Sequence, residues 1–216
     1  MVKEGYWYGL PLVLIAGGLM GAWLRERNAS LLVLTIFFLI LAVLVLNFFR
    51  DPDRHIPTDP QAIVSPADGR VVQVAEESYE GRAVRRVSIF MSPLDVHVNR
   101  APIAGTIQEV HYRKGAFRIA SQELASAENE QNVFSVQGAQ GEVVVKQIAG
   151  LVARRIVFWK HLGDTLERGE RVGMIKFGSR VDVLVEPKVG LCVRIGDHVR
   201  AGSSILGISE PSFQAG

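Results

Sequence analysis

The sequence predicts a mainly β fold, a small barrel-sandwich domain, preceded by an N-terminal hairpin of two transmembrane helices. Two long apolar runs without charged residues occupy residues 6–24 and 31–49. From residue 63 onward, short β-rich runs alternate with Gly, Pro and Asp turns, which is typical of all-β barrels and sandwiches. The formal net charge of +2 is too small to indicate a nucleic-acid partner. We therefore expect a membrane-anchored β protein.

The two apolar runs are long enough to cross a bilayer. At about 1.5 Å rise per residue, a run of about 19 residues spans about 28 Å, which is close to the hydrocarbon thickness. Aromatic residues mark the edges of the runs, at 6–8, Trp23 and 48–49. The alternative for the first run is a signal peptide, but it lacks a small-residue cleavage site before Arg25 and a second run follows at once. Two transmembrane helices are the prediction.

The basic residues around the hairpin indicate its orientation. Lys3, Arg50 and Arg54 lie on one side of the two runs, against Arg25 and Arg27 on the other. The positive-inside rule places the side with more basic residues in the cytoplasm. We therefore expect a protein of the cell membrane whose β domain lies on the cytoplasmic face.

A polar segment at 51–62, punctuated by proline, is the predicted linker between the hairpin at 1–50 and the β domain at 63–216. The spacing of the β-rich runs in that domain argues against alternating β and α units. The clearest predicted strands are 69–74, 84–90, 105–110, 133–136 and 142–148.

Internal similarity supports the barrel-sandwich prediction. Gly163-Asp-Thr-Leu-Glu-Arg-Gly169 matches Gly196-Asp-His-Val-Arg-Ala-Gly202, and each is followed by a short apolar run. A Pro-x-x-Gly-x-apolar pattern occurs at 66–71, 102–107 and 187–192. This arrangement resembles the barrel-sandwich fold of biotinyl and lipoyl carrier domains.

Gly178 and Ser179 lie between two apolar, β-rich runs, and the local pattern predicts a tight hairpin turn, because Gly takes positive φ at no steric cost. A carrier domain would display a modified lysine on such a turn, and Lys176 lies two residues before the glycine, so a carrier role stays open. Cys192 is the only cysteine and the five histidines are scattered, so the sequence shows neither an intramolecular disulfide nor a metal site.

Several motifs between Phe48 and Val185 are specific in their order and spacing. They are Phe-Phe-Arg-Asp-Pro at 48–52, Ser-Pro-Ala-Asp-Gly at 65–69, Met-Ser-Pro-Leu-Asp-Val-His at 91–97 with Asn-Arg-Ala-Pro at 99–102, Glu-Asn-Glu at 128–130 with Asn132, Ile-Ala-Gly-Leu-Val-Ala-Arg-Arg-Ile-Val at 148–157, and Gly-Glu-Arg-Val-Gly-Met-Ile-Lys-Phe-Gly-Ser-Arg at 169–180. Together they resemble the short, membrane-anchored form of the phosphatidylserine decarboxylase family.

The resemblance implies a self-cleaving enzyme with a pyruvoyl prosthetic group. The hydroxyl of Ser179 would attack the carbonyl of Gly178, and elimination followed by hydrolysis would leave a pyruvoyl group and ammonia. The products would be a β chain, Met1–Gly178, and an α chain, 179–216, that stay together as a heterodimer, with a higher oligomer left open. The resemblance further implies that the pyruvoyl ketone forms a Schiff base with the amine of phosphatidylserine, a membrane lipid, and that phosphatidylethanolamine and carbon dioxide are released.

The resemblance also implies roles for two other side chains. Asp68 is the expected partner in processing, with backbone capping in its Pro-Ala-Asp-Gly turn as the alternative. His97 is the expected acid/base for decarboxylation, because an imidazole exchanges protons near neutral pH, with a structural histidine as the alternative. The long-form enzymes carry a second histidine where this chain has Arg100, so the base for Ser179 is left open between His97 and another group.

Three arginines are candidates for contacts with the lipid headgroup, because a guanidinium binds phosphate and carboxylate bidentately. They are Arg154, Arg155 and Arg180, with solvated charge as the alternative for each. The family usually has Arg where this chain has Gln131, so we expect a contact there to be lost or replaced.

Two other functions stay open at this point. One is a non-catalytic, membrane-anchored barrel-sandwich adaptor or carrier, although membrane-fusion adaptors normally have one anchor and a long helical hairpin inserted in the sandwich. The other is a pyruvoyl decarboxylase acting on a soluble amino acid, which the two membrane helices disfavour. The sequence favours a membrane-bound phosphatidylserine decarboxylase over both.

Overall fold

The computed structural model describes residues 1–115, 129–150, 155–176 and 179–210. The chain divides into two units, Met1–Pro52 and Asp53–Gly216. The division falls at the start of the segment expected as a linker.

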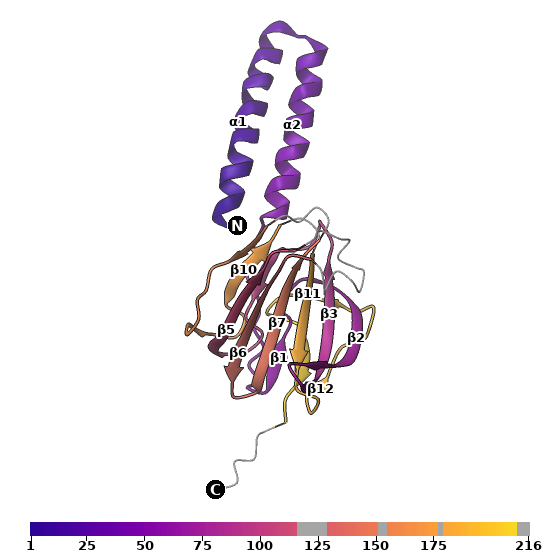
Figure 1. The fold of residues 1–216 in the computed structure, drawn as a ribbon. Coiled ribbons are helices and arrows are strands. Elements are labelled where there is room, and N and C mark those ends of the chain that lie inside the picture. Colours follow the sequence, from indigo (N-terminus) through magenta and orange to yellow (C-terminus); the bar gives the residue numbers. More distant parts are fainter. Residues whose placement is uncertain (116–128, 151–154, 177–178, 211–216) are drawn as a thin grey trace. The chain divides into compact units, whose positions relative to one another are not determined.

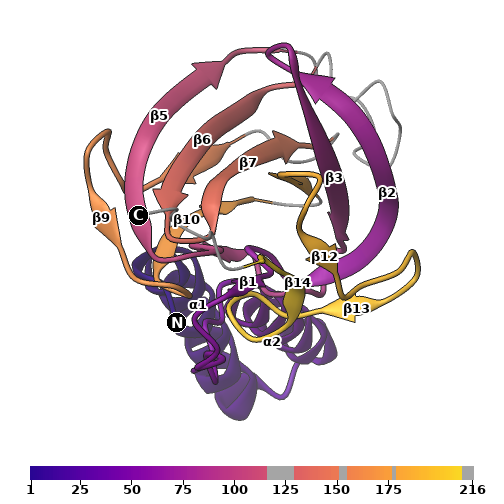
Figure 2. The ribbon, with the colours of Figure 1, turned by 90° about the horizontal axis from the view of Figure 1, so that it is seen from below.

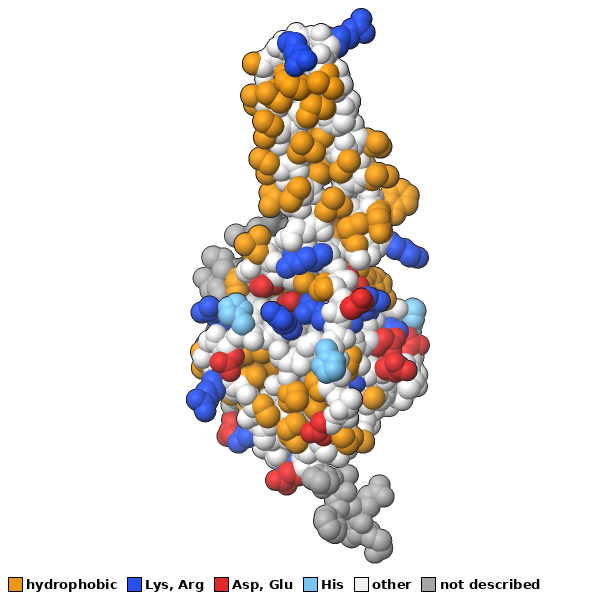
Figure 3. Space-filling model, turned by 180° about the vertical axis from the view of Figure 1, so that it is seen from behind, with side chains coloured by type: hydrophobic (Ala, Val, Ile, Leu, Met, Phe, Trp, Pro, Cys, Tyr) orange, Lys and Arg blue, Asp and Glu red, His pale blue; other side chains and the backbone are white. Residues whose placement is uncertain are grey.

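The first unit is a pair of antiparallel helices, α1 (Lys3–Glu26) and α2 (Ala29–Phe48) (Figure 1). Both are long and apolar enough to cross a membrane. Between them, Arg27 takes a left-handed conformation, and the Asn28 side chain caps α2 by accepting a hydrogen bond from the Ser30 N–H at 2.9 Å. Apolar side chains cover the outside of the pair, and arginine side chains lie at its tip (Figure 3). This is the surface expected of a membrane hairpin.

The second unit is built on an eight-stranded antiparallel sheet that curls into an open barrel, with β2 and β5 forming its two sides (Figure 2). The mainly β prediction is confirmed. The order of the strands in this sheet is β13 (His198–Val199), β2 (Gly69–Tyr79), β3 (Arg82–Met91), β11 (Ser179–Val185), β7 (Gly141–Ala149), β6 (Gln131–Gly138), β5 (Gly105–Arg113) and β9 (Thr165–Leu166).

Two small antiparallel sheets accompany the large one, and the core lies among the three. Alternate residues of the central strands face this core, for example Ile89 on β3 and Val181 on β11, where Ile63 and Ile175 from the small sheets join them. The first small sheet has the order β1 (Ala62–Val64), β14 (Ile205–Ile208), β12 (Gly190–Leu191), and the second has the order β4 (Val98–Arg100), β10 (Arg171–Ile175), β8 (Ile156–Phe158).

The repeated Gly-Asp turns occupy matching positions at the two edges of the large sheet. In the first copy the Gly163 N–H donates to the Ile107 carbonyl of β5 at 2.9 Å, and in the second the Gly196 N–H donates to the Val71 carbonyl of β2 at 2.8 Å. The strand after each turn then joins the sheet, β9 beside β5 and β13 beside β2. The internal similarity in the sequence therefore corresponds to a structural repeat.

The hairpin predicted around Gly178 and Ser179 is wrong. Strand β10, before these residues, pairs with β4 and β8, whereas β11, after them, pairs with β3 and β7. The chain therefore passes from a small sheet to the large sheet between Ile175 and Ser179. Gly178 itself lies outside the described residues.

Candidate functional site

Ser179 is the first residue of β11, at the point where the chain enters the large sheet. It pairs with Met91 of β3 on one side and with Ala149 of β7 on the other. Its side chain is fully buried, and its Oγ donates a hydrogen bond to Sδ of Met91 at 3.3 Å. A thioether sulfur is a weak acceptor and not a base, so another group must take the proton of an attacking serine.

A chain of three buried carboxamides ends at Met91, the side chain that Ser179 contacts. Nδ2 of Asn132 donates to Oε1 of Gln147 at 2.9 Å, and Nε2 of Gln147 donates to Oδ1 of Asn99 at 2.8 Å. Nδ2 of Asn99 points to the Pro66 carbonyl at 3.4 Å and to the sulfur of Met91 at 3.9 Å. The Met91 sulfur therefore contacts both Ser179 and the last carboxamide of the chain.

His97 lies directly before β4 and is fully buried. Its Nδ1 is 2.9 Å from the carbonyl oxygen of Asp95, which can only accept, so Nδ1 carries the proton and Nε2 is the basic nitrogen. The His97 carbonyl accepts from the Ile175 N–H at 3.3 Å, at the end of the strand that leads to Ser179.

Asp68 is bound by a residue of the expected linker. Both of its carboxylate oxygens accept from NH2 of Arg54 at 2.9 Å, and Oδ1 also accepts from the Ala201 N–H at 2.8 Å. Within the described part of the chain, its hydrogen bonds go to these two groups and none reaches Ser179. The Pro-x-x-Gly turn at 102–105 matches the turn at 66–69 and has Ala104 in the place of Asp68. The turn itself therefore does not require an aspartate. The role of Asp68 in processing stays a prediction.

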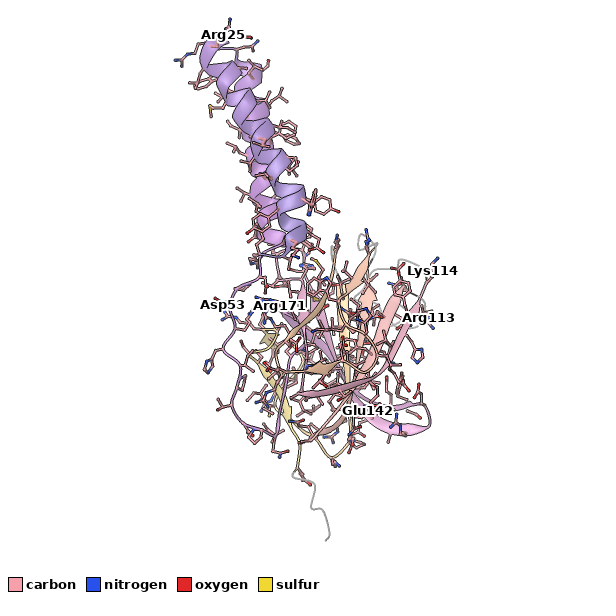
Figure 4. All side chains as sticks on the ribbon, turned by 90° about the vertical axis from the view of Figure 1, so that its left-hand side faces the viewer. Arg25, Asp53, Arg113, Lys114, Glu142 and Arg171 are labelled. Atoms are coloured by element: carbon pink, nitrogen blue, oxygen red, sulfur yellow. The ribbon has the colours of Figure 1, made fainter. Side chains whose placement is uncertain are left out.

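Arg100 stands on the opposite side of β4 from Asn99, because neighbouring residues of a strand face opposite ways. Its NH1 donates to the Gly169 carbonyl at 3.0 Å. Arg100 also borders a pocket of about 310 Å³ that is lined by both arginines and acidic residues. Two of the lining residues, Asp53 and Arg171, are labelled in Figure 4. The charged residues that line the pocket are Asp53, Arg54, Arg100, Glu167, Arg168, Glu170 and Arg171. This mixed charge does not define a ligand.

Arg180 follows Ser179, but its side chain lies on the other face of β11. It is only 1 % exposed, and its guanidinium binds the Asp182 carboxylate through Nε at 2.6 Å and the Ser88 hydroxyl through NH2 at 2.8 Å. Arg86 lies 3.5 Å from the same carboxylate. These contacts favour a structural role, in which a buried ion pair fixes the strand that begins with Ser179. The headgroup contact of Arg180 stays a prediction.

Replacing Asp182 with Ala tests this structural role. The change leaves two buried guanidinium groups without their shared carboxylate, so we expect the free energy of unfolding to fall by about 3–5 kcal/mol. Denaturant unfolding of the detergent-solubilised protein measures it. The matched control is Lys188→Ala, which removes an exposed ion pair with Glu186 (2.7 Å) and should leave stability nearly unchanged. Equal effects of the two substitutions would contradict a structural role.

Arg155 is exposed, and its carbonyl accepts from the Lys176 N–H at 3.2 Å. Nearby, partial burial of the Tyr112 side chain, which is still half exposed, raises its pKa to about 12. Its hydrogen bond to the Glu130 carboxylate contributes to the rise, and the charge of Arg155 opposes it. The guanidinium of Arg155 is thus open to solvent beside a tyrosine–carboxylate pair. Arg154 lies outside the described residues.

Gln131 lies opposite Arg113 in the pairing of β6 with β5. With its amide oriented to match its neighbours, the Gln131 oxygen accepts from Nε of Arg113 at 3.0 Å. Arg113 of the adjacent strand therefore places a guanidinium beside position 131, at the end of the sheet where Figure 4 shows Arg113 and Lys114. The loss or replacement of a family contact at Gln131 stays a prediction.

Two features of this site were not expected from the sequence. Asn99 and Asn132 belong to recognised motifs, but no pattern assigned them a role, and Gln147 lies in an ordinary strand-like run. No pattern in the sequence predicted that Arg54 would bind Asp68. Among the residues that the structure describes, no group of three or more His, Cys, Asp or Glu side chains is arranged to hold a metal ion.

The chain is also similar in sequence to known proteins. The family model described as phosphatidylserine decarboxylase matches residues 41–207. A phosphatidylserine decarboxylase proenzyme of Solibacter usitatus is 50% identical over 206 residues, covering 95% of this chain and 95% of its own. Proenzymes of the same description from Geotalea uraniireducens and Salinibacter ruber are 44% and 51% identical, the first covering 96% of both chains and the second 76% of this chain and 74% of its own.

Proposed function

We propose that this chain, which belongs to the phosphatidylserine decarboxylase family, cleaves itself between Gly178 and Ser179 and uses the resulting pyruvoyl group to convert phosphatidylserine to phosphatidylethanolamine and carbon dioxide. The observation that carries the proposal is the place of Ser179. It is a fully buried serine at the first residue of a central strand, just after the chain changes sheets. The word proenzyme in the names of the relatives supports a processed chain. The adaptor and carrier alternatives have no comparable support.

Self-cleavage by this route balances without an external oxidant or reductant. Oγ of Ser179 attacks the carbonyl carbon of Gly178, a base takes its proton, and the nitrogen of Ser179 leaves with a proton, so the amide becomes an ester. Removal of the α proton of residue 179 then expels the carboxylate of Gly178 and leaves a dehydroalanine. Its imine tautomer adds water and releases ammonia, which leaves the pyruvoyl group.

The surroundings of Ser179 fit a pyruvoyl group. Once the bond to Gly178 is broken, β11 is still paired with β3 and β7, and the Arg180–Asp182 ion pair holds the residue that follows the group. Burial keeps bulk water away from the position. The pyruvoyl group supplies an electron-accepting carbonyl to which the amine of the substrate attaches. We propose that Nε2 of His97 holds and returns the proton at the substrate α carbon.

The membrane hairpin suits a substrate that lies in a bilayer. We propose that the protein resides in the cell membrane with its β unit on the cytoplasmic face, supported by the apolar helices and by the basic residues that flank them. The partners proposed are membrane lipids and the two cleaved chains, which form a heterodimer through the strand pairs of β11.

Arg155 is proposed to contact the charged headgroup of the lipid. Arg155→Gln removes one charge-assisted contact at an exposed position, so we expect the KM for phosphatidylserine to rise about 10-fold with a smaller change in kcat. Initial rates on mixed vesicles measure both constants. The matched control is Arg82→Gln, because Arg82 is also exposed but binds the Glu142 carboxylate at 2.8 Å. Glu142 lies towards the other end of the sheet from Arg113 (Figure 4). Equal changes in KM for the two variants would exclude a specific contact.

The experiment that tests the function follows two readouts in one sample of the purified full chain. Mass analysis under denaturing conditions reports whether the chain is whole or in two pieces, and release of carbon dioxide from phosphatidylserine vesicles reports activity. An active protein that consists of one uncleaved chain would exclude the pyruvoyl mechanism.

A further inference from the structure

We propose that the carboxamide chain Asn132–Gln147–Asn99 positions the N–H of Asn99 as a hydrogen-bond donor for the self-cleavage of Ser179. This inference rests on the proposed self-processing and adds a residue to it. Asn99 is the donor, and Gln147 and Asn132 are positioning residues that act through it.

The chain of hydrogen bonds has one direction. Asn132 donates to Gln147 and Gln147 donates to Asn99, each through a carboxamide N–H to a carbonyl oxygen. Because the Asn99 oxygen is engaged by Gln147, its NH2 group must point the other way, towards the Pro66 carbonyl and the sulfur of Met91, which Ser179 also contacts. Successive hydrogen bonds of this kind also polarise one another in a buried site. The chain therefore orients the donor before any reaction takes place.

The last donor of the chain has the weakest acceptors. The other two bonds are 2.8–2.9 Å long, whereas Nδ2 of Asn99 lies 3.4 Å from the Pro66 carbonyl and 3.9 Å from the Met91 sulfur. Normal N–H···O bonds are about 2.7–3.2 Å long, so neither contact uses this N–H well. A nearby oxygen that becomes negatively charged would be a better acceptor.

Such an oxygen develops during self-cleavage on the carbonyl that is bonded to the nitrogen of Ser179. When Oγ of Ser179 attacks a carbonyl carbon, the carbonyl oxygen becomes an oxyanion, and a preoriented N–H donor stabilises it. Oγ of Ser179 and Nδ2 of Asn99 both contact the sulfur of Met91, at 3.3 and 3.9 Å. Met is unbranched and flexible, so this side chain can shift without disturbing the strands.

On the inner faces of β6 and β7, the carboxamides lie next to apolar residues of the core. On the inner face of β7, Val145 comes two residues before Gln147, and on β6, Phe134 comes two residues after Asn132. All four side chains are no more than 2 % exposed. Apolar residues would fill these positions without the cost of burying amides, so the polar pair calls for a functional reason.

The first test measures the rate at which newly made full chain is converted into its two pieces in membranes. Removal of an oxyanion donor costs about 10²–10³ in rate, so we expect Asn99→Ala to slow self-cleavage to that extent and Gln147→Leu to slow it about 10-fold. The matched control is Gln140→Leu, because Gln140 is a buried carboxamide that donates to the Pro60 carbonyl outside this chain. It should cleave at the parental rate.

The second test separates orientation from packing by comparing Gln147→Glu with Gln147→Leu. When protonated, the introduced carboxylic acid can donate to Oδ1 of Asn99, and when ionised it cannot, whereas leucine cannot donate at any pH. Asn132 and Val181 face position 147 from the flanking strands and carry no charge. The titratable His97 on the Asn99 segment is common to all variants, so we compare each rate with the parental rate at the same pH. This ratio should rise as the pH falls for Gln147→Glu and stay constant for Gln147→Leu.

The outcomes distinguish this inference from the function on which it rests. A parental chain that is active yet never cleaves overturns both. A parental chain that cleaves, together with an Asn99→Ala chain that cleaves equally fast, overturns only the role of the carboxamides. If Asn99→Ala fails to fold, the comparison of Gln147→Glu with Gln147→Leu decides. The inference is overturned if the cleavage rates of both variants, relative to the parental rate, depend on pH in the same way.

Discussion

Replacing Ser179 with Ala is expected to leave the chain in one piece and to abolish decarboxylation. The variant has no hydroxyl to attack the preceding carbonyl, so neither the ester nor the pyruvoyl group can form. Denaturing gels and intact mass should show a single chain of 216 residues for the variant. The parental protein should show one chain that ends at Gly178 and a shorter chain whose first residue, derived from Ser179, is blocked to amine-reactive reagents.

The matched control for this substitution is Ser135→Ala. Ser135 is also almost fully buried in the large sheet, and within the described part of the chain its hydroxyl has no hydrogen-bond partner. This variant should cleave and decarboxylate like the parent, which shows that loss of a buried hydroxyl alone does not stop the chemistry. Release of carbon dioxide from phosphatidylserine by Ser179→Ala would refute the mechanism.

Local patterns in the sequence were sufficient to predict the class of fold. The two charge-free runs became helices, and the predicted strands all lie within observed ones. The extension of β2 to Tyr79 was missed because its last residues are polar and alternate without an apolar face. In the structure, cross-strand ion pairs to β3 hold this extension, with Glu76 bound to Arg85 at 3.2 Å and Glu77 to Arg86 at 2.9 Å.

The change of sheet before Ser179 could not be predicted from the sequence. Apolar runs on both sides of a Gly-Ser pair fit a hairpin and a crossover equally well, because both need two strands and a flexible connection. The choice depends on the partners of each strand, which are β4 and β8 for β10 and β3 and β7 for β11. The local pattern around Gly178 and Ser179 does not identify these partners. The consequence for the site is that Ser179 enters a central strand with neighbours on both sides.

The candidate site was predictable only where a motif marks a residue. Ser179 and His97 belong to motifs of the family, and the structure brings His97 to the strand that precedes Ser179. Gln147 is a single polar residue in an apolar run, and its significance appears only when strand pairing sets it beside Asn132 and between that residue and Asn99. Arg180 shows the reverse case. It follows Ser179 directly in the sequence, and for that reason its side chain lies on the opposite face of the strand.

Replacing His97 with Ala is expected to lower the rate of decarboxylation by about 10²–10⁴-fold, the usual contribution of a positioned acid/base. The Asp95 carbonyl fixes the proton on Nδ1, so one defined nitrogen, Nε2, is left to exchange protons. Carbon dioxide release from phosphatidylserine vesicles measures the loss. The control is His198→Ala, since His198 is exposed on β13, where its Nε2 lies 3.1 Å from Arg70, and this variant should keep parental activity.

The state of the chain in the same His97→Ala sample separates the two roles open to this residue. If the chain is cleaved but inactive, His97 acts in decarboxylation and another group takes the proton of Ser179. If the chain stays whole, His97 is also the base for self-cleavage. This would fit the contact of its carbonyl with Ile175 at the end of β10, and the engagement of Arg100 with the Gly169 carbonyl. A cleaved chain with parental turnover would exclude His97 from the chemistry, because a buried imidazole that can be removed at no cost to the rate is a structural residue.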